Sequence, residues 1–175
     1  MDQKFRDTAR RIELLILDVD GVLTDGRLTF DSEGRELKTF HSRDGLGIRL
    51  LQRAGVEVAI ISGRASRMVT DRAASLGITR VYQGQDDKLT AFRTILDDTG
   101  LAADVVAFAG DDWIDLPVMT RVGLAISVAD GDPEVRRRAH YVTEREGGRG
   151  AVREICQALL DARGDTERLL SEYLP

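Results

Sequence analysis

Two aspartates with a short spacing follow the first strongly apolar stretch of the chain, in LLILDVDGVLTDG at 14–26. Asp18 and Asp20 are two positions apart, so an extended backbone through Val19 points both side chains to the same side. Like charges that close repel each other unless a cation or a proton lies between them. Asp and Gly are also ordinary turn residues, so the pair is either a plain strand end or part of a metal site.

Further polar groups follow later apolar runs. Ser62 and Gly63 end the second run, Asp111 and Asp112 end the third, and Lys88 begins a segment with helical periodicity. Several carboxylates, one lysine, one hydroxyl and glycines that admit a close ligand are the groups that magnesium-assisted phosphoryl transfer requires. The residue types therefore predict that reaction, provided that the groups meet in space.

The roles follow from the chemistry of such a site. Asp18 is predicted to attack phosphorus and form an acyl phosphate. Asp20 is predicted to give a proton to the departing alcohol and later to take one from water. Magnesium prefers oxygen ligands, and we expect them to be Asp18, Asp111 and the backbone carbonyl of Asp20.

The other polar groups are expected to bind phosphate or to orient its ligands. Ser62 and Lys88 would hold phosphate oxygens beside the backbone of Gly63, and either Asp112 or Asp115 would orient the waters of the metal or the lysine. Plainer interpretations are that Ser62 caps the next helix and that Lys88 is a solvated helix residue.

The elements that position these groups alternate along the chain. Four continuous apolar runs indicate strands covered on both faces, and they lie at 12–18, 56–62, 105–111 and 124–128. Three amphipathic stretches indicate helices, at 44–54, 66–76 and 86–98. The alternation predicts an α/β fold, a Rossmann-like three-layer sandwich with a parallel sheet. The loops at the carboxyl ends of such strands converge, so the acids would share one rim.

The segment at about 22–43 interrupts this alternation. RLTF and ELKTF flank the turn-forming DSEGR, which predicts a β-hairpin inserted after the first strand, with no large cap domain. The hairpin carries Leu28, Phe30, Leu37 and Phe40, which a lone two-stranded ribbon cannot bury. It either folds over its own domain or pairs with copies of itself, and we favour the oligomer because pairing also covers exposed strand edges.

Composition sets further limits. With 175 residues and 42% hydrophobic content, we expect one domain over 1–163 and a tail over 164–175. A net charge of -5 with well-mixed signs argues against nucleic acid as a partner, and the apolar runs are too short to span a membrane. We expect a cytoplasmic protein, in which the single cysteine, Cys156, is a core residue rather than a nucleophile. The role of His41 stays open.

Four motifs in order resemble those of the haloacid dehalogenase superfamily: DVDGVLTDG, SGR at 62–64, Lys88, and GDDWID at 110–115. Longer stretches, including DGLGIRLLQRAGVEVAIISGR and AHYVTEREGGRGAVREICQALL, closely resemble the 3-deoxy-D-manno-octulosonate 8-phosphate phosphatase family. The resemblance runs from Glu13 to Ala162. It implies a capless, magnesium-dependent phosphatase that hydrolyses this sugar-acid phosphate through an aspartyl phosphate, in lipopolysaccharide precursor synthesis.

The resemblance also implies a homotetramer, with the hairpins at its centre and a neighbouring subunit over each active site. Arg64 is expected to help recognise the sugar acid of the substrate. A related branch acting on nine-carbon sialic-type acid 9-phosphates tends to carry Glu there, so such a substrate is the alternative. Arg149, in GGRG, is expected to contact phosphate or the substrate carboxylate, in its own subunit or a neighbour. Trp113 departs from the family pattern, in which the tryptophan comes later, and is expected to serve packing or an interface.

A signalling module is the alternative from another class. Phosphoacceptor receiver domains also place acids, a hydroxyl and a lysine around magnesium on a parallel sheet. Their phosphorylated Asp follows a middle strand, whereas the middle strand here ends in Ser62. The order of the motifs therefore favours the phosphatase.

Overall fold

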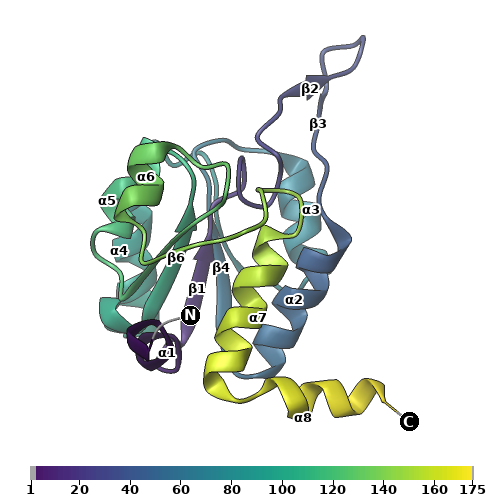
Figure 1. The fold of residues 1–175 in the computed structure, drawn as a ribbon. Coiled ribbons are helices and arrows are strands. Elements are labelled where there is room, and N and C mark those ends of the chain that lie inside the picture. Colours follow the sequence, from purple (N-terminus) through teal and green to yellow (C-terminus); the bar gives the residue numbers. More distant parts are fainter. Residues whose placement is uncertain (1–2, 175) are drawn as a thin grey trace.

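The computed structural model describes residues 3–174, and its centre is a six-stranded sheet (Figure 1). In spatial order the strands are β5 (Arg80–Tyr82), β4 (Glu57–Ile61), β1 (Leu14–Leu17), β6 (Val106–Gly110), β7 (Leu124–Ser127) and β8 (Tyr141–Val142). Every neighbouring pair is parallel. Because β1 lies between β4 and β6, the groups that follow these three strands emerge side by side at one edge of the sheet.

Helices cover both faces of the sheet (Figure 1). One layer contains α1 (Gln3–Ala9), α2 (Ser42–Arg53), α3 (Arg67–Ser75), α7 (Ala151–Arg163) and α8 (Thr166–Leu170). The other contains α4 (Lys88–Thr99), α5 (Leu116–Met119) and α6 (Pro133–Arg138). Within β1, Leu15 and Leu17 pack into the first layer, and Leu14 and Ile16 pack into the second. The predicted three-layer α/β fold with a parallel sheet is therefore confirmed.

The predicted strands and helices are present with small shifts at their ends. Helix α2 begins at Ser42, and His41 is its N-cap, because Nδ1 of His41 accepts a hydrogen bond from the backbone of Arg43 at 3.3 Å. Cys156 is fully buried in α7, which confirms its place in the core. The sequence did not indicate α1, α5, α8, β5 or β8. The two strands lie at the edges of the sheet and contain three and two residues, too few for a periodic signal.

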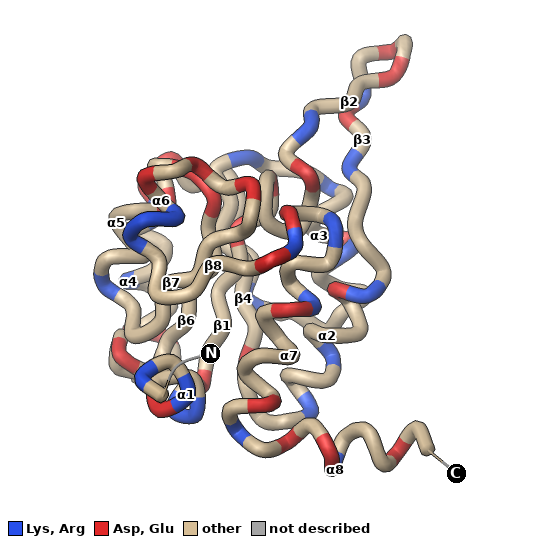
Figure 2. The backbone as a smooth tube through the Cα atoms, viewed as in Figure 1, with Lys and Arg blue, Asp and Glu red and all other residues tan. Residues whose placement is uncertain are grey.

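The inserted hairpin stands away from the sheet. Its strands, β2 (Thr29–Phe30) and β3 (Glu36–Leu37), pair antiparallel with each other and extend beyond the body of the molecule (Figure 1). Leu28, Phe30 and Leu37 are 50%, 56% and 50% exposed. Both basic and acidic residues lie along the hairpin, as they do along the rest of the chain (Figure 2). Phe40, at the base of the hairpin, is partly buried against the first layer, whereas Leu28, Phe30 and Leu37 are not buried against their own domain.

The segment assigned to a tail at 164–175 contains helix α8 and a 3-10 turn, η3 (Ser171–Tyr173). Leu169 of α8 is buried against the first layer, so the start of this segment packs on the domain. Two further 3-10 turns are η1 (Ala103–Val105) and η2 (Trp113–Asp115). Among the described residues, no helix has both the length and the apolar character that a membrane crossing requires.

Candidate active site

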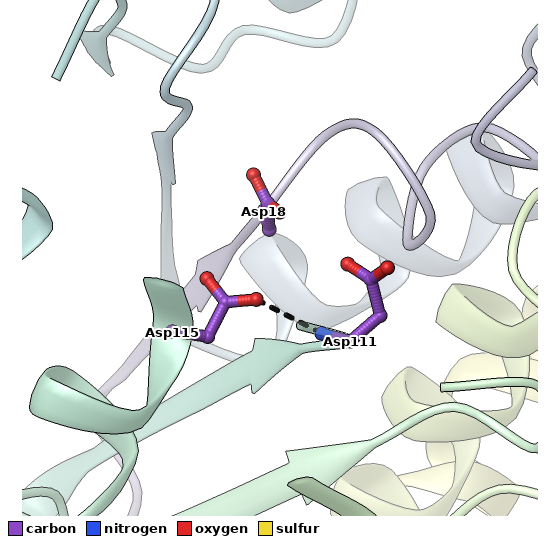
Figure 3. A group of neighbouring side chains, drawn as sticks. All are labelled: Asp18, Asp111 and Asp115. Carbon is purple, nitrogen blue, oxygen red and sulfur yellow. Dashed lines mark hydrogen bonds between the residues drawn. The ribbon is translucent and has the colours of Figure 1, made fainter. Parts of the chain in front are cut away.

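Three aspartates from separate segments converge at the carboxyl edge of the sheet. Asp18 follows β1, Asp111 follows β6, and Asp115 lies in η2 (Figure 3). One carboxylate oxygen from each lies within 4.8 Å of the others. Parallel pairing explains the convergence, because Leu17 is in register with Ala109, so the two strands end at nearly the same level. The predicted approach of Asp18 and Asp111 is thus observed.

Lys88 places a positive charge between two of these carboxylates. Its Nζ lies 2.8 Å from Oδ1 of Asp18 and 2.6 Å from Oδ1 of Asp115. Lys88 is the first residue of α4, where the carboxylate of Asp87 caps the helix by accepting from the backbone of Leu89 at 3.0 Å. The side chain of Lys88 is fully buried, so it is not a solvated helix residue. An ammonium has three donors, and the third can serve a phosphate oxygen.

Asp115 and Asp112 have different surroundings. Oδ2 of Asp115 accepts hydrogen bonds from the backbone of Asp111 at 2.9 Å and of Asp112 at 3.2 Å, while Oδ1 accepts from Lys88. Asp112 caps η2 by accepting from the backbone of Trp113 at 2.7 Å. Because both oxygens of Asp115 already have donors, it is better suited to orient Lys88 and the Asp111 loop than to bind a metal directly.

The carboxylates of Asp18 and Asp111 fit a divalent cation. Burial, reinforced by the charge of Asp115 and opposed by Lys88, raises the pKa of Asp18 to about 7. Burial and the charges of Asp18 and Asp115 raise the pKa of Asp111 to about 8. Oδ1 of Asp111 is buried, and none of the described residues donates a hydrogen bond to it. A buried acceptor without a donor is costly, and an oxygen-binding cation is the species that satisfies it.

The side chain of Asp20 belongs to a separate ion-pair network. Oδ1 of Asp20 pairs with Nζ of Lys38, which follows β3, and Oδ2 lies 3.8 Å from Nε of Arg64. Glu36 in β3 connects these two cations, because its Oε1 lies 2.8 Å from Arg64 and 3.5 Å from Lys38. Arg64 therefore lies at the site, where its guanidinium is paired with Glu36. We refer to these four residues as the hairpin-base network.

Asp18 and Asp111, together with Asp20 and Arg64 of the network, line an open cavity of about 280 Å³. Its lining residues are Asp18, Asp20, Gly26, Leu28, Ser62, Gly63, Arg64, Asp111, Asp112 and Ile114. Ser62 is buried and receives a 3.4 Å contact from the backbone N–H of Arg64, while the N-cap of α3 is Ser66. Arg149 is exposed, pairs with Glu146 at 3.2 Å, and is not among the described residues that line the cavity.

Glycines allow two loops to pack against the segment after β1. A Cβ at Gly21, whose φ is +96°, would lie 2.1 Å from Oδ2 of Asp111. A Cβ at Gly147 would lie 1.7 Å from the carbonyl oxygen of Gly21, and one at Gly148 would lie 2.4 Å from the backbone nitrogen of Asp25. The GGRG segment thus supports the loop that carries Asp18 and Asp20, and any side chain at these positions would displace it.

Sequence reasoning did not identify Lys38, Glu36 or the packing role of Gly147. Lys38 lies in an alternating strand pattern that gives no reason to separate it from an exposed lysine. Gly147 touches a segment more than 100 positions earlier, and no local periodicity encodes such a contact. The GGRG sequence itself was the one available signal, since consecutive glycines indicate close approach of backbones.

Comparison with known proteins supports these observations. A family model described as haloacid dehalogenase-like hydrolase matches residues 77–155. The chain is 54% identical over 156 residues to the 3-deoxy-D-manno-octulosonate 8-phosphate phosphatase KdsC of Escherichia coli K12, covering 89% of this chain and 83% of that protein.

Solved structures agree with the sequence comparison. A crystal structure of 3-deoxy-D-manno-octulosonate 8-phosphate phosphatase from Yersinia pestis superposes with a TM-score of 0.94 at 48% identity, covering 95% of this chain and 90% of that one. The phosphatase of the same description from Moraxella catarrhalis, in complex with magnesium ion, phosphate ion and KDO molecule, gives a TM-score of 0.96 at 40% identity, with 99% of each chain covered.

Proposed function

Because the chain belongs to the 3-deoxy-D-manno-octulosonate 8-phosphate phosphatases, within the haloacid dehalogenase-like hydrolases, we propose that it converts this sugar-acid phosphate into 3-deoxy-D-manno-octulosonate and phosphate. The observation that carries the proposal is the cluster of Asp18, Asp111, Asp115 and Lys88, of which Asp18 and Asp111 line the cavity. Membership of a hydrolase family excludes the receiver-domain alternative. We place the reaction in the cytoplasm, in lipopolysaccharide precursor synthesis.

In the first chemical step we propose that Asp18 attacks phosphorus. The carboxylate forms a bond to phosphorus while the bond from phosphorus to the ester oxygen breaks, and Asp20 gives its proton to that oxygen. Lys88 holds one oxygen of Asp18 at 2.8 Å and, together with Ser62, orients the phosphoryl oxygens. Gly63 lines the cavity and, because it has no side chain, leaves its backbone open to the phosphate.

In the second step water replaces Asp18 on phosphorus. Asp20, now ionised, takes a proton from the water as its oxygen bonds to phosphorus, and the carboxylate of Asp18 is released. Asp18, Asp111 and the backbone carbonyl of Asp20 are the proposed ligands of magnesium. A bound magnesium ion supplies positive charge that stabilises the phosphoryl oxygens and keeps the nearby carboxylates ionised. Asp115 keeps Lys88 and the Asp111 loop in place.

A panel of phosphate esters tests which substrate the protein prefers. We expect the highest kcat/KM for 3-deoxy-D-manno-octulosonate 8-phosphate, lower values for nine-carbon sialic-type acid 9-phosphates, and the lowest for small generic esters. Arg64 lines the cavity, and we propose that it recognises the sugar acid. Arg64→Glu should therefore lower kcat/KM mainly for the octulosonate ester. If the unaltered protein prefers a nine-carbon ester, the proposed substrate is wrong, but the assignment as a phosphatase stands.

Magnesium should stabilise the protein more as the pH rises. The folded-state pKa values of Asp18 and Asp111, about 7 and about 8, exceed the ordinary value of 3.8. Without metal the folded protein therefore binds more protons than the unfolded chain across that window, and its stability falls as pH rises. Magnesium binds the ionised carboxylates, so its stabilisation, about 2.7 kcal/mol at 100 times Kd, should be largest at high pH.

The measurement is thermal unfolding with and without magnesium chloride, at about pH 5 and about pH 8.5, at matched ionic strength. The upward shift of Tm should be larger at the higher pH. In Asp111→Asn, which retains the shape of the side chain and loses its charge, the shift should largely disappear. Equal shifts at both pH values would contradict the proposed ligands.

We further propose that the hairpin assembles the protein into a homotetramer. Support comes from three exposed apolar side chains on the hairpin, those of Leu28, Phe30 and Leu37. The two strands of the hairpin contain only two residues each, so the ribbon is not stable by itself. Trp113 and Ile114, beside the cavity, are 62% and 52% exposed. A neighbouring subunit that buries the hairpins would also cover this rim, and closed symmetry would leave no hairpin unpaired.

Phe30→Asp should dissociate this assembly, because a charge would be buried at each contact. We expect later elution in size-exclusion chromatography and a smaller mass by light scattering, with an unchanged circular dichroism spectrum. Leu170→Asp, a matched change of a residue 45% exposed on α8 at the far end of the molecule, should leave the mass unchanged. Identical elution of Phe30→Asp and the unaltered protein would exclude the hairpin as the contact.

A further inference from the structure

The hairpin-base network contains a buried lysine, Lys38, that takes no part in the chemical steps described above. The side chain of Lys38 is 3% exposed, and its Nζ contacts Oδ1 of Asp20 and lies 3.5 Å from Oε1 of Glu36. A buried ammonium is costly unless carboxylates surround it, so its partners determine where it lies. Its backbone is held in turn, because its N–H donates to the sulfur of Met68 in α3 at 3.3 Å.

Asp20 depends on this lysine for its orientation. Among the described residues, Lys38 makes the one short side-chain contact of this carboxyl, since Arg64 lies 3.8 Å from Oδ2 and pairs more closely with Glu36. With Oδ1 tethered, the carboxyl of Asp20 is oriented at the cavity that it lines. Proton transfer requires that the carboxyl stay within hydrogen-bonding distance of the ester oxygen, so a freely rotating carboxyl would transfer protons more slowly.

We propose that Lys38 is the positioning residue for proton transfer by Asp20, and that it links this transfer to the base of the hairpin. The inference rests on the proposed function, in which Asp20 protonates the leaving oxygen. Glu36 lies in β3 and Lys38 follows it directly, so a change in the direction of the hairpin arm moves the group that holds Asp20. An assembly that fixes the hairpins therefore also fixes the orientation of the acid.

The test compares two esters that differ in their need for a proton. An alkyl ester such as octulosonate 8-phosphate releases a strongly basic oxygen, whereas 4-nitrophenyl phosphate releases a stable phenolate that needs no protonation. In Lys38→Met, kcat/KM for the alkyl ester should fall at least about tenfold more than for the aryl ester, part of the 100- to 10,000-fold that general acid catalysis contributes. Lys4→Met, an exposed lysine on α1, is the matched control and should change neither value.

A double-mutant cycle separates positioning from simple structural support. If Lys38 acts through Asp20, then Lys38→Met should have little further effect on the alkyl ester in an Asp20→Asn background. Multiplicative losses, or equal losses on both esters, would overturn the proposal. If the unaltered protein prefers another alkyl phosphate, that ester takes the place of octulosonate 8-phosphate in the comparison. The role of Lys38 can therefore be tested even if the proposed substrate is wrong. An unaltered protein that hydrolyses no ester would overturn both proposals.

Discussion

Asp18→Asn is expected to lower phosphate release by about ten-thousandfold or more, because an amide cannot form the acyl phosphate on which both chemical steps depend. The fold should persist. Asparagine has nearly the same shape, and its carbonyl oxygen can still accept the hydrogen bond from Lys88 that Oδ1 of Asp18 accepts at 2.8 Å. The loss should appear in kcat for every ester, including 4-nitrophenyl phosphate.

The same change should not destabilise the metal-free protein. Burial and the charge of Asp115 raise the pKa of Asp18 to about 7, which means that the folded state disfavours its ionised form. A neutral amide avoids this cost, so Tm without magnesium should be unchanged or higher. Asp97→Asn, the same substitution at an exposed position of α4, is the matched control and should retain full activity. Activity of Asp18→Asn near that of the control would remove Asp18 as the nucleophile.

Lys88→Met should cause the largest loss of stability of the changes considered. The ammonium lies between Asp18 and Asp115, and all three side chains are at most 6% exposed. Burial alone would lower the pKa of Lys88, but the two carboxylates outweigh it and raise that pKa. Removing one partner of a buried ion pair typically costs about 3–5 kcal/mol, because the other charge stays buried without compensation. Chemical denaturation should show this loss, together with loss of phosphate release.

A second change identifies the physical cause. Adding Asp115→Asn to Lys88→Met should recover part of the free energy of unfolding, because the uncompensated charge is removed. The oxygen of the amide can still accept from the backbone of Asp111 and Asp112, as Oδ2 of Asp115 does. Lys4→Met serves as the surface control. If the double variant is less stable than Lys88→Met, the loss reflects packing of the lysine stem rather than charge.

Much of the fold could be predicted because its signals are local. Continuous apolar runs indicated β1, β4, β6 and β7, since strands covered on both faces need apolar side chains at every position. The edge strands β5 and β8 were not indicated, because they are short and only partly buried. The hairpin was indicated by its turn residues, but its projection into solvent depends on how the body of the domain is packed.

The amino-acid sequence by itself determined which groups reach the rim, because the carboxyl ends of parallel strands meet at one edge and Asp18, Ser62 and Asp111 follow three of them. Only the tertiary structure decided which groups pair there. Asp115 rather than Asp112 holds Lys88, Lys38 holds Asp20, and Gly147 lies on the backbone of Gly21. These contacts join segments far apart along the chain, so they depend on the packing of loops and side chains and not on any local repeat.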